Sequence, residues 1–397
     1  MKVTLDLSEH WYIKGGIWRY GTSLARELVR ILPPENVRLV CFDRVPPDRV
    51  RDLELTGASV SAGLHRQLDR MTQIASRVTG SITGLDTARW PVRGPFATIA
   101  RSGLGSADVW HFLSRVRVTR GSTPLVGTIH DLTAILFPEA YTQKPGEYVA
   151  FLNAHRDNCE RVIAVSDATK RDLVRIAGFD PGKIDVVYHG IDLEAFNDVP
   201  QSDTEVLSRY GLIGGGYFLS VGTLEPRKNL DLLVDAYLAA RDLGKFETPL
   251  VIVGALGWKM DPFMKRVTDP QISNHVRILG FVPDRDLAAL YRGAFAFAYL
   301  SLYEGFGFPP LEAMACGAPV IASNTSSLPE VVGDAGILVN PTSVKEIVEA
   351  LLAVLENQDL REKLRQQGLR RAREFTWNRT AHQTLAVYER GQKSFRG

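Results

Sequence analysis

Short apolar runs alternate with amphipathic segments along most of this 397-residue chain. In the first half, these runs predict six strands, at residues 3–7, 37–42, 108–112, 125–129, 161–165 and 184–188. The segment 17–31, between the first two strands, carries its apolar residues at helical spacing, and two prolines at 33 and 34 end it. Strand, helix and strand in this order predict a parallel sheet with right-handed crossovers.

A second series of apolar runs follows a polar break. Residues 195–216 are polar and end in three glycines, which is typical of a linker between domains. Six further strands are predicted, at residues 217–221, 249–253, 276–279, 295–300, 319–322 and 336–339. Asn229, a favoured N-cap residue, opens a helical pattern after the first of them. Three more helices are expected at the end, over 343–356, 359–374 and 377–394.

This order of elements predicts an α/β protein with two Rossmann-like, doubly wound domains in series. A length of 397 residues also suits two domains better than one compact core. Ligands of such sheets bind beyond the carboxyl ends of the strands, so a cleft between the two domains is the expected site.

Composition places the chain among ordinary globular proteins, with 45% apolar and 23% charged residues and a net charge of +2. Cys41, Cys159 and Cys316 are widely spaced and form no CxxC pair, which favours a reducing compartment and argues against a zinc site. The first residues lack an apolar signal core, and no apolar run approaches the roughly 20 residues of a membrane span. A cytoplasmic location is therefore expected.

One charged segment stands out. Residues 61–130 contain nine arginines and three aspartates, a net charge of +6, with no lysine or glutamate. Such a segment could contact an anionic membrane or an acidic acceptor. The alternative is a solvated face whose salt-bridge partners lie elsewhere in the fold.

Two carboxylates mark the strongest candidate site. Glu304 follows the strand 295–300 and is expected in the loop at its carboxyl end. Two prolines suit the first turn of the next helix and Gly317 suits its end, so Glu312 lies near the positive end of that helix. Between the two acids, Gly305 and Gly307 let backbone N–H groups approach a ligand closely. Carboxylates suit sugar hydroxyls and amides suit anionic oxygens, so the pattern fits a polyhydroxyl group that carries phosphate.

Other strand ends add matching groups. Arg227 and Lys228 follow the strand 217–221 just before a predicted helix start, and two cations there suit a diphosphate. In the first domain, the Gly15-Gly16 pair follows the first strand, and His130 with Asp131 follows the strand 125–129.

Each of these features also has a simpler explanation. The two glutamates could only stabilise the fold, His130 could be a satisfied core histidine, and Gly15-Gly16 could be an ordinary turn. Asp284-Arg285-Asp286 imitates a metal-binding DxD motif, but the pattern around it predicts a turn followed by a helix that these aspartates cap.

Three other kinds of function make different demands on the sequence. An oxidoreductase would need GxGxxG between a strand and a helix, whereas the glycines at 214–216 precede their strand. A sugar-nucleotide epimerase with the same fold would turn over without an acceptor. A carbohydrate-binding protein would need no nucleotide and would leave Arg227 and Lys228 unexplained.

Taken together, the motifs resemble those of the retaining glycosyltransferases of family four, which have the glycosyltransferase-B fold. The resemblance covers nearly the whole chain and rests on these segments in this order: 15–16, 128–131, 162–173, 186–196, 221–230, 280–294, Glu304-x7-Glu312 and 375–389. It implies an acceptor-binding domain at 1–195, a linker at 196–216 and a nucleotide-sugar-binding domain at 217–376. Residues 377–397 would form a helix that packs back on the first domain.

The resemblance also implies a role for each matching residue. In the second domain, Arg227 and Lys228 would bind the donor's diphosphate, Glu312 the ribose and Glu304 the sugar hydroxyls. The other donor-binding residues there would be Gly222, Val282 for the base, and the backbone N–H groups of Phe306, Gly307 and Phe308. In the first domain, His130 would lie beside the anomeric carbon and Gly16 near the diphosphate. Many family members carry arginine where this chain has Thr223, and Arg227 is expected to replace that charge.

The implied reaction keeps the configuration at the anomeric carbon through an oxocarbenium-like state, with His130, Glu304, Lys228 and Arg227 as the catalytic groups. Segments 128–132, 221–230 and 257–259 most resemble bacterial mannosyltransferases that use GDP-mannose in surface-polysaccharide assembly. Rhamnosyl or glucosyl donors carried on UDP, dTDP or ADP stay open. The expected acceptor is a saccharide or lipid-linked saccharide at the inner face of the cytoplasmic membrane. No metal ion, other cofactor or nucleic acid is expected.

Overall fold

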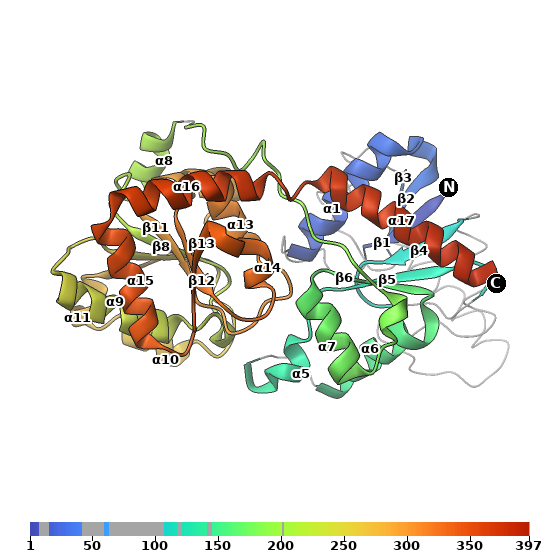
Figure 1. The fold of residues 1–397 in the computed structure, drawn as a ribbon, viewed down its shortest axis with the longest axis horizontal. Helices are drawn as coiled ribbons and strands as arrows, with labels where there is room; N and C mark the ends of the chain where they lie inside the picture. The colour runs from blue at the N-terminus through green and yellow to red at the C-terminus, as the bar shows by residue number, and fades with distance from the viewer. Residues whose placement is uncertain are drawn as a thin grey trace, which may run out of the picture.

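The structure is a computed structural model. It describes residues 1–7, 16–41, 59–62, 107–116, 121–140, 145–200 and 202–396. Figure 1 shows two lobes side by side, each built around its own sheet. Every strand pairing in both sheets is parallel, which confirms the predicted α/β fold with two Rossmann-like domains.

The N-terminal lobe has a seven-stranded sheet in the order β3-β2-β1-β4-β5-β6-β7. Its strands are β1 (Val3–Asp6), β2 (Val37–Cys41), β3 (Ser59–Ala62), β4 (Val109–Phe112), β5 (Leu125–Ile129), β6 (Arg161–Ala164) and β7 (Ile184–Val186). Its helices are α1 (Gly16–Ile31), α5 (Thr133–Leu136), α6 (Pro145–Asn158) and α7 (Asp167–Ala177). The strand order reverses between β1 and β4, so the carboxyl ends of these strands flank a natural binding crevice.

The C-terminal lobe has a six-stranded sheet in the order β10-β9-β8-β11-β12-β13. Its strands are β8 (Phe218–Val221), β9 (Leu250–Val253), β10 (Val276–Gly280), β11 (Ala296–Tyr299), β12 (Val320–Ser323) and β13 (Gly336–Val339). Its helices are α8 (Asp203–Arg209), α9 (Leu230–Gly244), α10 (Asp261–Val267), α11 (Pro270–Ser273), α12 (Asp284–Gly293), α13 (Phe308–Ala315), α14 (Leu328–Val332), α15 (Val344–Glu356) and α16 (Gln358–Ala372). Here the order reverses between β8 and β11.

Apolar side chains cover both faces of each sheet. In β8, Leu219 and Val221 join one buried cluster while Phe218 joins another on the opposite face. This alternation follows from the two-residue period of a strand. Burial on both faces explains why the strands read as continuous apolar runs in the sequence.

The last helix, α17 (Trp377–Arg396), leaves the C-terminal lobe and packs on the N-terminal one. Its buried residues Trp377, Ala381, Val387 and Tyr388 belong to the same apolar cluster as Leu5 of β1. Figure 1 shows this helix in red across the N-terminal lobe. The expectation that the C-terminal helix crosses back is therefore confirmed.

The two chain crossings between the lobes run side by side. Ile191, just after β7, forms a parallel bridge with Thr376, just before α17, and the Ile191 N–H donates to the Phe375 carbonyl at 3.0 Å. A Cβ atom on Gly190 would lie 2.1 Å from the Trp377 nitrogen, so only glycine fits there. The two segments that connect the lobes are therefore held together by this pairing.

The structure corrects three details of the sequence reading. Strand β3 was not predicted, because its sequence SVSA carries no apolar run. The predicted linker contains helix α8, whose Val206 and Leu207 are buried against the C-terminal lobe. Asn229 is not an N-cap by its side chain, because its backbone is left-handed (φ 58°) and its amide donates to the Pro341 carbonyl at 2.7 Å.

Two predictions from the sequence are not tested by the structure. Most of the arginine-rich segment 61–130 lies outside the described residues, so its contact with a membrane stays a prediction. The residue boundaries proposed for the domains also stay a prediction, although the break between the sheets falls between β7 and β8.

A buried polar chain crosses the core of the N-terminal lobe. His111 of β4 is hydrogen-bonded through Nδ1 to the Tyr388 hydroxyl at 2.8 Å and through Nε2 to the Thr128 hydroxyl at 2.7 Å. The Thr128 hydroxyl lies 3.2 Å from that of Tyr20 on α1. Burial lowers the pKa of His111 to about 3, so its ring is neutral in the folded protein.

We predict that stability falls as the pH drops below about 6.5. His155 and His189 are also buried, and burial lowers the pKa of His155 to about 4 and that of His189 well below its ordinary value. Between those values and pH 6.5 the unfolded chain binds protons that the folded chain excludes, at a cost of at most about 2 kcal/mol per histidine at pH 5. Urea unfolding at pH 5 to 8 measures the free energy of unfolding at each pH. A His155→Gln variant should lose less stability between pH 7 and 5 than the wild type, and an equal loss would contradict the account.

Candidate active site

The candidate site forms where the strand order of the C-terminal sheet reverses. Lys228 and Arg227 follow β8, and Glu304 follows its neighbour β11. Lys228 Nζ lies 2.6 Å from Glu304 Oε1, and Arg227 Nη1 lies 2.8 Å from Glu304 Oε2. The Tyr299 hydroxyl donates to the same Oε1 at 2.8 Å. The structure thus brings together the two cations and the carboxylate that the sequence predicted to meet.

Charges, not solvent, keep this buried carboxylate ionised. Burial raises the pKa of Glu304, but the adjacent Arg227 and Lys228 outweigh it and hold that pKa far below its usual range. For Lys228, burial and the neighbouring Arg227 lower the pKa of the ammonium group, and Glu304 opposes them. Arg227 also pairs with Glu225, so the cluster combines two carboxylates with two cations and has no net formal charge.

Glycine lets the lysine lie against the end of strand β8. A Cβ atom on Gly222 would lie 3.4 Å from Lys228 Cε, and Gly222 has a φ of 155°, which a side chain would strain. Gly254, after β9, is packed so tightly that an added Cβ would meet the Gly222 carbonyl oxygen at 1.9 Å. Gly222 therefore has a positioning part in the site.

Two serines fix the loop between Glu304 and helix α13. The Ser326 hydroxyl accepts from the Glu304 N–H at 2.9 Å, and the Ser327 hydroxyl donates to the Glu304 and Phe306 carbonyls at 2.9 and 2.6 Å. Pro309 and Pro310 have no N–H, so the free donors at the start of α13 are the N–H of Phe308 and those of the loop before it. An N–H group of this kind at a helix start suits an anion.

Glu312 lies in α13 and is almost fully buried. Its Oε2 accepts from the Tyr291 hydroxyl at 3.0 Å, and its Oε1 is paired with Arg19 of the N-terminal lobe. Arg19 lies in the first turn of α1 and also reaches Asp284 at 3.3 Å. The predicted ribose carboxylate is therefore present, but in this structure the opposite lobe supplies one of its partners.

His130 faces the loop of Glu304 from the N-terminal lobe. Its Nε2 donates to the Leu113 carbonyl at 3.0 Å, so Nδ1 is the acceptor nitrogen of the ring. Burial lowers the pKa of His130 to about 4, which makes the ring neutral at physiological pH. A Cβ atom on Gly305 would lie 1.7 Å from the His130 carbonyl oxygen. The two lobes therefore touch, backbone to backbone, directly beside Glu304.

The start of α1 meets the start of α13. A Cβ atom on Gly16 would lie 3.5 Å from the ring of Phe308, which is an ordinary contact distance. Gly16 is the first residue of α1, whereas Gly15 lies outside the described residues. Two helix N-termini of opposite lobes therefore converge on this part of the crevice, where their dipoles favour an anion.

Sequence reasoning missed His189. This buried residue follows β7 and stacks on Phe308, with ring centroids 5.1 Å apart and the planes 1° from parallel. It also contacts the rings of Tyr20 and Phe306. Its position inside the motif VVYHGID, one residue before the crossing at Gly190, was the available signal. His189 thus links the connection between the lobes to the first residue of α13.

A second contact closes the lobes at helix α7. The Glu330 carboxylate of α14 accepts from the N–H groups of Asp167 and Ala168 at 2.8 and 2.7 Å. The same carboxylate pairs with Arg171 at 3.3 Å. An anion at a helix N-terminus satisfies donors that have no intrahelical partner. The two lobes therefore share a second charged contact, between helices α7 and α14.

One expectation for the loop before α12 needs correction and one stays a prediction. The Val282 side chain is buried in the C-terminal core and its neighbour Phe281 is 71% exposed, so contact of Val282 with the base stays a prediction. Asp286 does not cap α12, whose N-cap is Pro283; it instead bonds to Arg209 at 2.9 Å and to the Tyr210 hydroxyl at 2.8 Å. Across the described parts of the chain, no three His, Cys, Asp or Glu side chains group to hold a metal ion.

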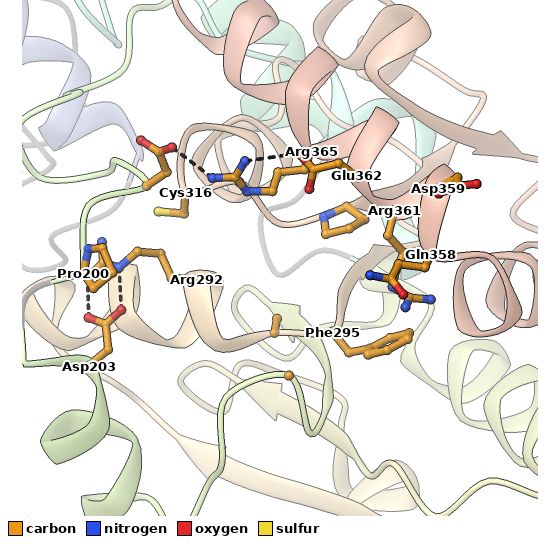
Figure 2. A pocket seen from close by; sticks show the side chains of 15 residues that line it. Pro200, Asp203, Arg292, Phe295, Cys316, Gln358, Asp359, Arg361, Glu362 and Arg365 are labelled. Atoms are coloured by element: carbon orange, nitrogen blue, oxygen red, sulfur yellow. Dashed lines mark hydrogen bonds and ion pairs between the residues drawn. The ribbon is translucent and has the colours of Figure 1, made fainter.

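A pocket of about 720 Å³ lies at the opposite end of the C-terminal sheet from the candidate site (Figure 2). It is lined by Phe295 and Pro319, which precede β11 and β12, so it opens at the amino ends of these strands. Arg292 there forms two 2.7 Å bonds to Asp203 at the start of α8. The pocket contains none of the predicted donor-binding residues. Its charged pairs, Arg292 with Asp203 and Arg365 with Asp198, join the segment after the first crossing to helices α12 and α16.

Comparison with known proteins identifies the family of this chain. Residues 14–195 match the family model described as Glycosyltransferase Family 4, and residues 214–371 match the one described as Glycosyl transferases group 1. The O-antigen chain mannosyltransferase B of Escherichia coli is 36% identical over 265 residues, which cover 66% of this chain and 70% of that protein. A D-inositol 3-phosphate glycosyltransferase of Actinosynnema mirum is 31% identical over 353 residues, 80% of this chain and 82% of that protein.

Among solved structures, Anabaena HepE in complex with UDP and glucose has the same fold, with a TM-score of 0.75 at 18% identity over 98% of this chain and 99% of that one. The chain belongs to the family 4 glycosyltransferases, is similar to their mannosyltransferases, and is a hexosyltransferase with the glycosyltransferase-B fold. In the part of the chain that the structure describes, no helix has both the length and the apolar character needed to cross a bilayer.

We predict that Gly305→Ala lowers turnover at least about 100-fold while both lobes stay folded, because the added methyl group forces Gly305 away from the His130 carbonyl and misplaces the groups that act together. Turnover assays and circular dichroism measure the two effects. Gly146→Ala is the matched control, since a Cβ atom there meets nothing within 4 Å. Normal turnover by Gly305→Ala would show that this approach of the lobes is not needed.

Proposed function

We propose that this protein is a retaining glycosyltransferase that moves mannose from GDP-mannose to a saccharide or lipid-linked saccharide in bacterial surface-polysaccharide synthesis. One observation carries the proposal: buried Glu304 is paired with Lys228 and Arg227 at the strand reversal, directly beside the contact with His130. The name of the 36% identical relative, an O-antigen chain mannosyltransferase, supports the choice of sugar and pathway.

In this proposal the donor lies between the lobes. Lys228 and Arg227 bind the diphosphate together with the N-termini of α1 at Gly16 and of α13 at Phe308. Glu304 accepts hydrogen bonds from the sugar hydroxyls and Glu312 from the ribose hydroxyls. The base contacts the backbone at Val282. The two cations, which also pair with Glu304 and Glu225, are then shared with the donor's phosphate oxygens.

The pairing of Glu304 favours a direct transfer over a covalent intermediate. A carboxylate held by two cations and a hydroxyl is a weak nucleophile, because its lone pairs are engaged and its pKa is far below normal. The acceptor oxygen then attacks the anomeric carbon on the face that the diphosphate leaves. Its proton passes to the departing diphosphate oxygen, so the carbon exchanges one oxygen for another with the same configuration.

The side chains contribute by stabilising charge. Lys228 and Arg227 stabilise the negative charge that grows on the leaving diphosphate. His130 is neutral at physiological pH, so it adds no positive charge beside the oxocarbenium-like sugar ring, and its Nδ1 is an acceptor. No metal ion or other cofactor takes part in this proposal.

The acceptor is proposed to reach the enzyme at the inner face of the cytoplasmic membrane, with segment 61–130 as the membrane contact. Other donors are the main alternative, and the 31% identical relative carries the name D-inositol 3-phosphate glycosyltransferase. A sugar-nucleotide epimerase of the same fold is distinguished by turnover without any acceptor.

We predict that Lys228→Ala and Glu304→Ala each reduce turnover by about 100-fold or more, because each removes a preorganised charge from the site. Steady-state assays with a saturating donor measure this, and circular dichroism checks the fold. The exposed Lys265→Ala serves as the control for loss of a lysine elsewhere in the same lobe. Near-normal turnover in one of the two site variants would show that the substituted residue has no part in the mechanism.

The donor is tested by thermal shift with GDP, UDP, dTDP and ADP at equal concentration. We predict the largest rise in melting temperature with GDP, since a ligand that binds only the folded state stabilises it by mass action. GDP-mannose should then release GDP faster with a mannose-containing acceptor than alone. A larger rise in melting temperature with another nucleotide would show that the donor carries that nucleotide instead of GDP. Equal turnover with and without an acceptor would favour the epimerase.

A further inference from the structure

Arg19 occupies an unusual place between the lobes. It starts from the first turn of α1 in the N-terminal lobe and reaches two carboxylates of the C-terminal lobe, Glu312 and Asp284. Its guanidinium also lies 5.7 Å from the ring centre of Phe196 and 6.0 Å from that of Phe308. The aromatic rings and the carboxylates together hold the side chain across the crevice.

These contacts overlap the place proposed for the nucleoside. Glu312 is the carboxylate assigned to the ribose, and Asp284 lies two residues after Val282, which is assigned to the base. One oxygen of Glu312 is bonded to Tyr291 from its own lobe, and the other is bonded to Arg19. A ribose that reaches Glu312 must therefore displace Arg19 or share its oxygen.

We propose that Arg19 is an internal ligand of the empty nucleoside subsite, which the donor displaces and which thereby sets donor affinity. The inference rests on the proposed function, because that function assigns Glu312 to the ribose.

The exchange follows from the burial of Glu312. A buried carboxylate is costly unless it is paired, so the empty enzyme needs a partner for the oxygen that Tyr291 does not satisfy. Arg19 supplies that partner from the opposite lobe. Two ribose hydroxyls can take its place, and Arg19 then returns to the crevice, where 28% of its side chain is already exposed to solvent.

The displaced arginine also links donor binding to lobe contact. In the empty enzyme, Arg19 ties α1 to α13 across the crevice, next to the contact between Gly16 and Phe308. When the nucleoside takes Glu312, this tie is lost, and the donor itself bridges the lobes. When no donor is bound, Arg19 therefore helps to hold the two lobes together, and this pairing lowers the affinity for the donor.

The test measures binding by isothermal titration calorimetry. The probe is GDP, or whichever of UDP, dTDP and ADP binds the wild-type protein most tightly, and the nucleoside of the same base without phosphate is the second probe. The nucleoside carries no charge for an arginine to attract, so it isolates the competition for Glu312. Arg26→Ala, an exposed arginine on the same helix, is the control.

We expect Arg19→Ala to bind both probes about tenfold more tightly than the wild type, and Arg19→Gln to fall between the two. In a Glu312→Gln background, where the ionic competition is already gone, removing Arg19 should change the affinity less than twofold. A gain in affinity cannot result from a damaged fold, and Arg19→Gln decides the matter if Arg19→Ala does not fold.

Equal or weaker binding of the nucleoside by both Arg19 variants would overturn the inference, and weaker binding of the diphosphate alone would make Arg19 a donor ligand instead. The proposed function fails separately. If no nucleoside diphosphate binds the wild type, or if Lys228→Ala binds as well as the wild type, the donor site itself is misassigned.

Discussion

The site depends on one constraint, which is that the buried carboxylate of Glu304 cannot stay charged without cations beside it. Lys228 and Arg227 meet this need because β8 and β11 are neighbours at the point where the strand order reverses. The residues that follow these two strands are far apart in sequence and adjacent in space. The fold thus builds a compact cluster of opposite charges, with no net formal charge, at the carboxyl ends of these two strands.

The contact between the lobes places groups of the N-terminal lobe beside this cluster. The backbone of Gly305 lies against that of His130, so the loop of Glu304 and the end of β5 form one surface. On either side, the C-terminal lobe supplies a carboxylate and the N-terminal lobe supplies the donors: Glu330 accepts from the start of α7, and Glu312 pairs with Arg19. A polar or charged ligand can take the place of one partner in such a contact.

Much of the fold, and the meeting of Lys228 and Arg227 with Glu304, was predictable from sequence. Buried parallel strands read as apolar runs, and the residues that follow them, such as Lys228 and Glu304, stand out as charged groups next to apolar segments. The misses have physical causes. Strand β3 has no apolar run to reveal it, and Asn229 adopts a left-handed backbone that its identity as a cap former did not indicate. The pairing of Arg19 with Glu312 joins residues 293 positions apart, and no local pattern encodes such a contact.

The central claim is that the donor's diphosphate binds between the lobes on Lys228 and Arg227. A crystal structure of the protein soaked with GDP-mannose tests this most directly. The account predicts phosphate oxygens within hydrogen-bond distance of both cations, with sugar hydroxyls on Glu304 and the anomeric carbon facing His130. A diphosphate bound anywhere outside this crevice, for example in the pocket of Figure 2, would contradict it.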